Sequence, residues 1–249
     1  MVDTHCHLDL CEPSADKLVE NARAAGVTRL ATVGIDPDST ARSLALAEAH
    51  DEVVAIVGRH PNSATGFAAA DAEAIRFAAG HRRVRAIGET GLDYYRDHAP
   101  RADQRRAFEA QVDLARELDL PVVIHTRAAE EDTFSILRER ANGLTVILHC
   151  FSAPERLNEC VERGYLCSFA GNATYRKAAD IQAAARDIPE DLLLVETDSP
   201  FLSPQPVRSK PNQPANVVRT AEHIAGLRGV DYATLEAAVD SNAAKVFGW

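Results

Sequence analysis

Two histidines, His5 and His7, lie near the start of the sequence with one residue between them. In an extended strand alternate side chains point the same way, so Asp3, His5 and His7 would share one face, with Thr4 and Cys6 on the other. Two imidazoles on one face of a strand can hold a single metal ion from the same side. This spacing makes a metal-dependent enzyme the first hypothesis. The alternative is an N-terminal strand that merely carries two histidines, and the rest of the chain must decide between the two.

Further residues of metal-ligating types follow other short apolar segments of the chain. These residues are His60, Glu89, His125, His149, Glu196 and Asp198. A single histidine after an apolar strand is more often a hydrogen-bonded structural residue than a ligand. Burying this many ionisable groups together is costly unless they are paired or bound to metal, so the set as a whole favours a functional site.

The elements that must position these residues alternate between short apolar runs and helical patterns along the whole chain. After the first strand, the predicted strands cover 29–35, 53–58, 84–88, 122–125, 144–149, 165–169 and 192–196. The predicted helices cover 14–25, 38–50, 71–79, 102–118, 129–140, 154–163, 178–186, 216–227 and 232–246. The strands are continuous apolar runs, which is typical of parallel strands covered by helices.

Eight such strand–helix units predict an α/β protein with one domain over residues 1–249, folded as a closed (β/α)₈ TIM barrel. A doubly wound open sheet is the alternative. The lack of a glycine-rich phosphate-binding sequence after the first strand counts against that alternative. Barrel enzymes build their sites at the carboxyl ends of the strands, which is where the candidate residues fall.

The candidate ligands are histidines and carboxylates, without a cysteine tetrad. Such a set suits Mg²⁺, Mn²⁺ or Zn²⁺, and one carboxylate can bridge two ions. A two-metal site polarises a phosphoryl or carbonyl oxygen and lowers the pKa of a bound water. Asp198 could then accept the proton of that water.

Composition limits the partners and the compartment. The net charge of −10 leaves no broad basic surface for non-specific binding to duplex nucleic acid. Five scattered cysteines without a CxxC pair suit reduced thiols in a cytoplasmic protein. No apolar run approaches the roughly 20 residues needed to span a bilayer, and no secretory signal is expected.

Metal ions and a few local basic residues must therefore attract any phosphate-rich substrate. Arg208 and Lys210 lie in a stiff, proline-rich segment, 199–214, that is expected to face the mouth of the barrel. A second group follows the fourth predicted strand: Tyr94, Tyr95, Arg96, Arg101, Arg105 and Arg106. That group is either a basic and aromatic rim for a nucleic-acid strand or solvated charges at a helix start, with tyrosines packed on the barrel.

Six segments spread over the whole chain occur together in a specific order. They are Val-Asp-Thr-His-Cys-His-Leu at 2–8, Gly-Glu-Thr-Gly-Leu-Asp-Tyr-Tyr at 88–95, Pro-Val-Val-Ile-His-Thr-Arg at 121–127, His-Cys-Phe-Ser at 149–152, Glu-Thr-Asp-Ser-Pro-Phe-Leu at 196–202, and the ending at 242–248. In these segments the sequence resembles the TatD family of metal-dependent deoxyribonucleases, within the broader group of amidohydrolase-like metal-dependent hydrolases.

The resemblance implies roles for most of the candidate residues. His5 and His7 would hold a first metal ion, Glu89 would bridge to a second, and His125 and His149 would hold the second. Asp198 would bind the first ion and act as the base, so Glu89 and Asp198 are the expected catalytic residues. His60 would face the substrate or a further metal ion. Arg208, because of its place in the proline-rich segment rather than because of the resemblance, is a second expected substrate contact.

The chain departs from the family pattern at two positions. Ala153 stands where the family commonly has glycine, and Gln213 stands where it commonly has glutamate. Neither is an expected ligand. We expect both near the rim of the site, where they bear on substrate preference rather than on the chemistry.

The first functional hypothesis is a hydrolase of phosphodiester bonds, with 3′→5′ exonuclease action on single-stranded DNA and possibly RNA implied by the resemblance. It requires two divalent metal ions, and the expected state is a monomer or weak oligomer. The alternative is a metal-dependent ester or amide hydrolase, such as a deacylase of aminoacylated tRNA. A third possibility is a barrel that uses metal only for stability.

Overall fold

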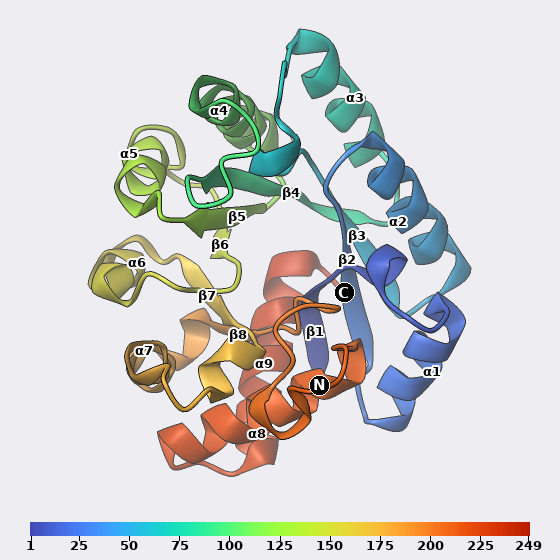
Figure 1. Ribbon diagram of the computed structural model, residues 1–249, viewed down its shortest axis with the longest axis vertical. Coiled ribbons are helices and arrows are strands. Elements are labelled where there is room, and N and C mark those ends of the chain that lie inside the picture. The colour runs from blue at the N-terminus through green and yellow to red at the C-terminus, as the bar shows by residue number, and fades with distance from the viewer.

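The computed structural model describes residues 1–249 and shows eight parallel strands arranged in chain order around a barrel (Figure 1). The strands are β1 (Val2–Cys6), β2 (Arg29–Gly34), β3 (Val53–Val57), β4 (Val84–Asp93), β5 (Val122–Arg127), β6 (Val146–Leu148), β7 (Leu166–Phe169) and β8 (Leu193–Val195). The predicted barrel is confirmed, and the open doubly wound sheet is excluded by this strand order.

The barrel closes between its first and last strands just beyond the end of β8. The main-chain N–H of Asp198 donates to the carbonyl of His5 at 2.9 Å, and the N–H of His7 donates to the carbonyl of Ser199 at 2.8 Å. These two bonds place the segment after β8 alongside the His5–His7 segment. Residues far apart in the sequence thereby become neighbours at the mouth of the barrel, by which we mean the carboxyl ends of the strands and the loops that follow them.

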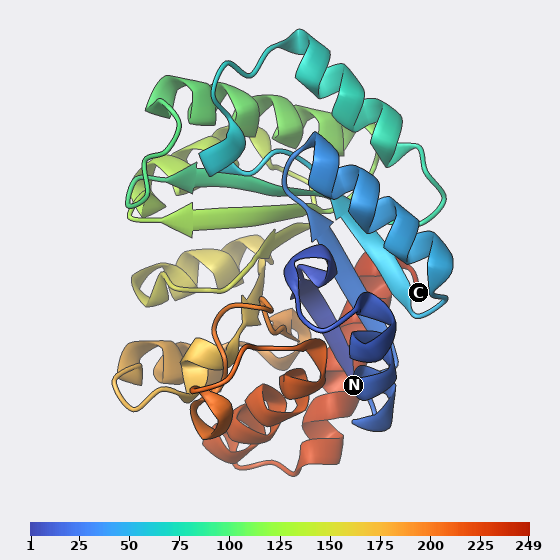
Figure 2. The same ribbon diagram turned by 45° about the vertical axis from the view of Figure 1, so that its right-hand side comes forward.

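Nine α-helices surround the strands and cover their outer faces (Figures 1 and 2). They are α1 (Ala15–Ala24), α2 (Pro37–Ala49), α3 (Ala69–Ala79), α4 (Arg101–Glu117), α5 (Glu130–Arg140), α6 (Leu157–Arg163), α7 (Ala179–Asp187), α8 (Val217–Arg228) and α9 (Tyr232–Phe247). Local sequence explains several ends. Ser14 caps α1 by accepting from the N–H of Lys17, and Gly229 ends α8 in the left-handed conformation, with φ of 68°.

Strand β4 is longer than the sequence pattern predicts, because it continues past Gly88 to Asp93. The predicted strand stops at Gly88, whereas Gly88 and Gly91 both lie within the observed strand, with φ of 146° and 143°. A side chain on Gly91 would collide with the main chain of His125 on the neighbouring strand. The glycines therefore permit two backbones to approach closely, and the longer strand carries Glu89 and Asp93 into the mouth.

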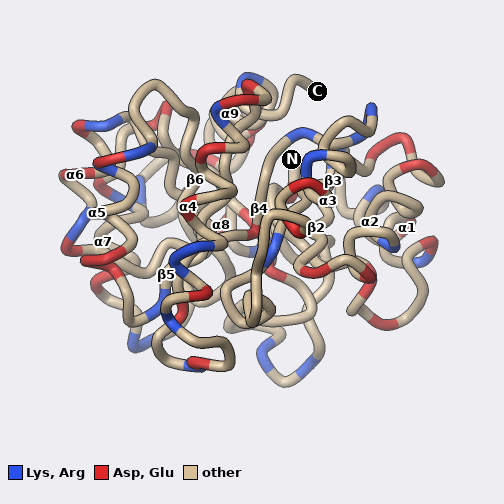
Figure 3. Tube along the Cα trace, turned by 90° about the horizontal axis from the view of Figure 1, so that it is seen from above, with Lys and Arg blue, Asp and Glu red and all other residues tan.

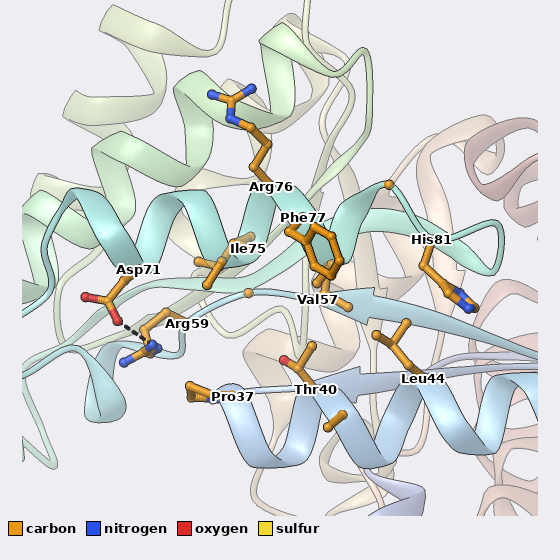
Figure 4. Close-up of a pocket in the computed structure, with 15 residues that line it drawn as sticks. Pro37, Thr40, Leu44, Val57, Arg59, Asp71, Ile75, Arg76, Phe77 and His81 are labelled. Carbon is orange, nitrogen blue, oxygen red and sulfur yellow. Dashed lines mark hydrogen bonds and ion pairs between the residues drawn. The ribbon is translucent and has the colours of Figure 1, made fainter.

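The outer layer contains a largely apolar groove of about 720 Å³ between α2 and α3 (Figure 4). Phe77 stands at its edge and is 88% exposed, while Arg59 pairs with Asp71 at one end. The floor includes Val57 and Gly58, but no candidate metal ligand lines the groove. The groove therefore lies in the outer layer and contains none of the candidate metal ligands.

Charges of both signs are interspersed over the molecule, as the blue and red segments of Figure 3 show. This agrees with the absence of a broad basic surface that the net charge of −10 indicates.

None of the helices has the length and apolar character that crossing a membrane requires. All five cysteines are free thiols.

Candidate metal centre

The mouth of the barrel brings together the side chains that the sequence separates by up to 193 positions. His5 and His7 come from the end of β1, Glu89 from β4 and His125 from β5. His60, His149 and Asp198 follow β3, β6 and β8, respectively. Parallel strands in a barrel end at the same side, which explains why residues placed after so many strands meet at one site.

Glu89 lies at the centre of this cluster, and its two oxygens face different groups of histidines. Its Oε2 lies 3.4 Å from Nε2 of His5 and 3.9 Å from Nε2 of His7. Its Oε1 lies 2.7 Å from Nδ1 of His125 and 3.3 Å from Nε2 of His149. A carboxylate whose two oxygens face separate groups of histidines can bridge two metal ions, one at each group.

The first of these positions lies between β1 and the segment after β8. Oδ1 of Asp198 is 3.4 Å from Nε2 of His7 and 3.9 Å from Nε2 of His5. The main-chain bonds that close the barrel hold Asp198 in place beside both histidines. Asp198 has a positive φ of 52°, so its main chain adopts a conformation that Asp tolerates better than most residues.

The second position lies on the β4–β6 side of Glu89. His125 and His149 face Oε1 of Glu89, and Nε2 of His60 lies 3.5 Å from the same oxygen. The main-chain N–H of Asn62 donates to Nδ1 of His60 at 3.0 Å. A neutral His60 that accepts this bond carries its own proton on Nε2, which suits a hydrogen-bond donor better than a metal ligand.

Two carboxylates behind the second position have no assigned role in the sequence prediction. Oδ2 of Asp93 lies 3.3 Å from Nε2 of His125, and Oε1 of Glu196 lies 2.8 Å from Nδ1 of His149. Each faces the ring nitrogen remote from Glu89. Both residues stand in the same strand-end segments as the predicted ligands, and that placement was the available signal for them.

The ionisation of the cluster reflects its dense packing of imidazoles and carboxylates. Burial alone would raise the pKa of Glu89, but the charges of His149 and His60 and a hydrogen bond from His125 hold it well below its ordinary value. Burial opposes the charged form of His149 too, yet Glu196 and Glu89 raise its pKa to about 10. Burial dominates at His5 and lowers its pKa.

The residues present fit divalent cations. Both ring nitrogens of His5 are buried without a hydrogen-bond partner, which is costly for a polar group unless another ligand satisfies it. Ligand-type atoms lie within 4.8 Å of one another in three groups: His5, His7 and Glu89; His60, Glu89 and His125; and His5, His149 and Glu196. Imidazole and carboxylate donors of this kind suit Mg²⁺, Mn²⁺ or Zn²⁺.

Asp3 shares the inward face of β1 but is not part of the cluster. Its Oδ1 accepts from the main-chain N–H of Thr197 at 2.8 Å, and its Oδ2 accepts from the hydroxyl of Thr197 at 2.6 Å. Burial raises the pKa of Asp3 to about 8. Asp3 thus anchors the segment that carries Asp198, one layer below the candidate ligands.

The remaining sequence predictions fall outside the cluster. Arg208 is exposed on the loop after β8, with its guanidinium 3.9 Å from the ring centre of Tyr175. Ala153 is fully buried, and Gln213 accepts a hydrogen bond from Asn21 of α1 at 2.9 Å. Neither side chain belongs to the cluster, and their bearing on substrate preference stays a prediction.

The barrel and its buried cluster of histidines and carboxylates define the class of metal-dependent hydrolases. The chain belongs to the TatD family, because the family model described as TatD related DNase matches residues 2–248. The chain is similar to a protein of Bacillus subtilis named uncharacterized metal-dependent hydrolase YabD, with 37% identity over 99% of this chain and 98% of that protein.

Two further comparisons place the chain in the same family. It is 34% identical to a protein of Cronobacter sakazakii named 3′-5′ ssDNA/RNA exonuclease TatD, over 93% of this chain and 91% of that protein. The crystal structure of YjjV, a TatD homolog from Escherichia coli, superposes with a TM-score of 0.93 at 28% identity, over 100% of this chain and 98% of that one. The protein is therefore a TatD-family metal-dependent hydrolase.

Proposed function

We propose that this hydrolase cleaves phosphodiester bonds and acts as a 3′→5′ exonuclease on single-stranded DNA or RNA. The observation that carries the proposal is the position of Glu89, whose two oxygens face separate groups of histidines 2.7 to 3.9 Å away. The name of the Cronobacter sakazakii relative supports the polymer and the direction. We further propose that the protein works in the cytoplasm as a monomer or weak oligomer.

Six side chains are the proposed metal ligands, arranged for two divalent ions. His5, His7 and Asp198 would hold the first ion, His125 and His149 the second, and Glu89 both. When bound, such ions polarise the phosphoryl oxygen and lower the pKa of an attacking water. Mg²⁺ and Mn²⁺ are the ions we propose first, with Zn²⁺ as a further candidate.

Asp198 is the proposed acceptor of the proton from the attacking water. Burial raises the pKa of its carboxyl, but a hydrogen bond from His7 and the positive charges of His149 and His7 outweigh burial and lower it. The side chain is therefore a carboxylate at neutral pH. It stands at the mouth beside the first position, where a water held against the scissile phosphate would lie.

His60 is the proposed substrate contact nearest the second position. With Nδ1 occupied by the N–H of Asn62, the proton on Nε2 points towards Oε1 of Glu89. That proton is available to a phosphate oxygen that enters the cluster. Burial lowers the pKa of His60, which keeps the ring neutral and fixes the donor on that nitrogen.

The test uses oligonucleotides labelled at either end and incubated with the protein and Mg²⁺ or Mn²⁺. Progressive shortening of a 5′-labelled strand, with release of a single labelled nucleotide from a 3′-labelled strand, is the expected result. A chelator and His125→Ala should each abolish it, whereas His81→Ala, in the segment between α3 and β4 at the opposite end of the barrel, should not. No shortening, or equal shortening by His125→Ala, contradicts the proposal.

The alternative chemistry is attack on a carbonyl group, as in deacylation of aminoacylated tRNA. A two-metal site that polarises a phosphoryl oxygen can polarise a carbonyl oxygen as well. The net charge of −10 does not choose between the two reactions, because tRNA is a polyanion like a DNA strand. Incubation with charged tRNA separates the two. Release of amino acid without loss of nucleotides would support the carbonyl reaction, and loss of nucleotides supports the nuclease.

A further inference from the structure

Exposed aromatic rings stand on two sides of the mouth. Phe201, after β8, is 53% exposed, and its ring centre lies 6.1 Å from that of His7. Tyr95, after β4, is 67% exposed and stands on the side of the second position. Single exposed apolar residues are common on proteins, but rings that flank a reactive centre offer flat surfaces on which bases can stack.

The main chain around Phe201 is fixed although its ring is open to solvent. The N–H of Phe201 donates to the carbonyl of Asp198 at 2.9 Å. The side-chain amide of Asn212 donates to the carbonyl of Phe201 at 2.7 Å and to that of Thr197 at 2.9 Å. Because the main chain that carries the ring is already fixed, only the side-chain torsions of Phe201 lose freedom when a ligand stacks on it, which lowers the entropy cost of binding beside Asp198.

Two arginines at the mouth are also held in place, each by stacking on a tyrosine. The guanidinium of Arg127 lies 4.0 Å from the ring centre of Tyr95, and that of Arg208 lies 3.9 Å from the ring centre of Tyr175. Tyr175 is itself fixed, because its hydroxyl donates to the carbonyl of Ser203 at 3.0 Å. A guanidinium stacked on a ring keeps its N–H groups free at its edge, where they can meet phosphate oxygens.

Cations without acidic partners are concentrated at this mouth. Most lysines and arginines of the chain pair with a carboxylate within 4.0 Å. Those on the segments at or after the ends of β4, β5, β7 and β8 that form no such pair are Arg96, Arg127, Arg176, Lys177, Arg208 and Lys210. An acidic protein that leaves these cations free around one opening presents a local site for a polyanion.

We propose that the terminal base of a single strand stacks on Phe201 while neighbouring phosphates contact Arg127 and Arg208. The proposal rests on the nuclease function proposed above and adds how the strand is held. Recognition through a flat face and through phosphate charge is independent of base sequence. It requires an unpaired terminal base, because a base within a duplex end is stacked on its neighbour and paired.

The first test measures binding of a fluorescent single strand with phosphorothioate linkages, which resist hydrolysis, to the metal-loaded protein. Phe201→Ala should weaken binding by about tenfold, in line with the loss of one stacked base. A strand with abasic residues at both ends should bind the wild-type protein about tenfold more weakly as well. It should bind the wild-type protein and Phe201→Ala equally.

The matched control is Phe77→Ala, which removes an 88% exposed ring from α3, far from the metal centre. This variant should bind both strands as the wild-type protein does. The proposal is overturned if Phe201→Ala binds the intact strand normally. It is also overturned if this variant loses as much affinity for the abasic strand as for the intact one.

The second test measures the salt dependence of binding for Arg127→Gln and Arg208→Gln. Each should reduce the slope of log K against log salt by about 0.7, the value for one phosphate contact of a single strand. The control is Arg29→Gln, since Arg29 is unpaired but begins β2 at the opposite end of the barrel. Slopes equal to that of the wild-type protein in both mouth variants would exclude the two arginines as phosphate contacts.

Parallel cleavage assays separate this proposal from the proposed function. A protein that cleaves single strands while Phe201→Ala binds them normally is a nuclease that does not stack a base on Phe201. A protein that binds through Phe201 but cleaves no phosphodiester keeps the strand-binding site and loses the proposed function. A blunt duplex that binds as tightly as a single strand would contradict the requirement for an unpaired base.

Discussion

Glu196 supports His149 from behind: its Oε1 lies 2.8 Å from Nδ1 of the histidine, while Nε2 of the same ring faces Glu89 at 3.3 Å. The same Oε1 accepts the main-chain N–H of Cys150 at 2.9 Å, which fixes its position. A carboxylate against the remote nitrogen orients an imidazole and makes it a stronger ligand. At the first position, the remote Nδ1 of His7 meets only the carbonyl of Val33, at 3.4 Å.

Replacing Glu196 should therefore weaken metal binding at the second position. Glu196→Gln keeps the size of the side chain but removes its charge, and we expect the affinity for the second ion to fall about tenfold. Calorimetric titration of the metal-free protein measures the affinity for each of the two ions. Glu155→Gln, an exposed glutamate without an ion pair, is the control, and equal affinities in the two variants would show that Glu196 gives His149 no support.

Removing both histidines of β1 should empty one position and spare the other. In the double variant His5→Ala, His7→Ala, Glu89 still has His125 at 2.7 Å and His149 at 3.3 Å. We expect the bound metal, measured by elemental analysis, to fall from about two ions per chain to about one, because a two-metal site with one side intact keeps its other ion. Loss of both ions, or of neither, would count against the bridge at Glu89.

The stability of the metal-free protein should fall as the pH rises above neutrality. The pKa of His149 is raised from 6.5 to about 10 in the folded protein. The folded state therefore binds this proton more tightly than the unfolded state does. The resulting stabilisation is complete below pH 6.5 and is lost as the pH rises through 10.

Thermal melting in a chelator across this range measures the effect. His149→Gln should flatten the dependence, and His98→Gln, at an exposed site, should leave it as in the wild-type protein. Added Mg²⁺ or Mn²⁺ should raise the melting temperature more at pH 9 than at pH 6.5, since a metal ion must displace the proton from His149. An increase in melting temperature with pH in the chelator would contradict the assignment.

Gly91 should not tolerate a side chain. Its φ is 143°, and a Cβ there would collide with the main chain of His125. We expect Gly91→Ala to lower the free energy of unfolding by about 3 kcal/mol or more, because overpacking and an unfavourable φ each cost about 1–2 kcal/mol. Gly143→Ala, with φ of 76° and open space around it, should cost only about 1 kcal/mol in denaturant unfolding. Similar losses in both would show that the contact with β5 is unimportant.

Sequence periodicity predicted the barrel because each strand is a short apolar run that a helix must cover. The sequence also predicted which strand ends hold the candidate metal ligands, since histidines and carboxylates directly follow those apolar strand segments. It misplaced the end of β4, because a glycine in a strand that another backbone approaches looks the same in sequence as a glycine in a turn. Only the contact between Gly91 and His125 distinguishes the two.

The sequence alone thus determines which residue types lie at the mouth, namely imidazoles and carboxylates at the ends of parallel strands. The alternation of strands and helices along the chain favours a barrel. The tertiary structure decided which of these side chains contact one another. Which oxygen of Glu89 faces which histidine, and which carboxylate stands behind His149, depend on barrel closure between β1 and the segment after β8 and on the close approach of β4 to β5. Such distances arise from packing between elements far apart in the chain, and no local pattern encodes them.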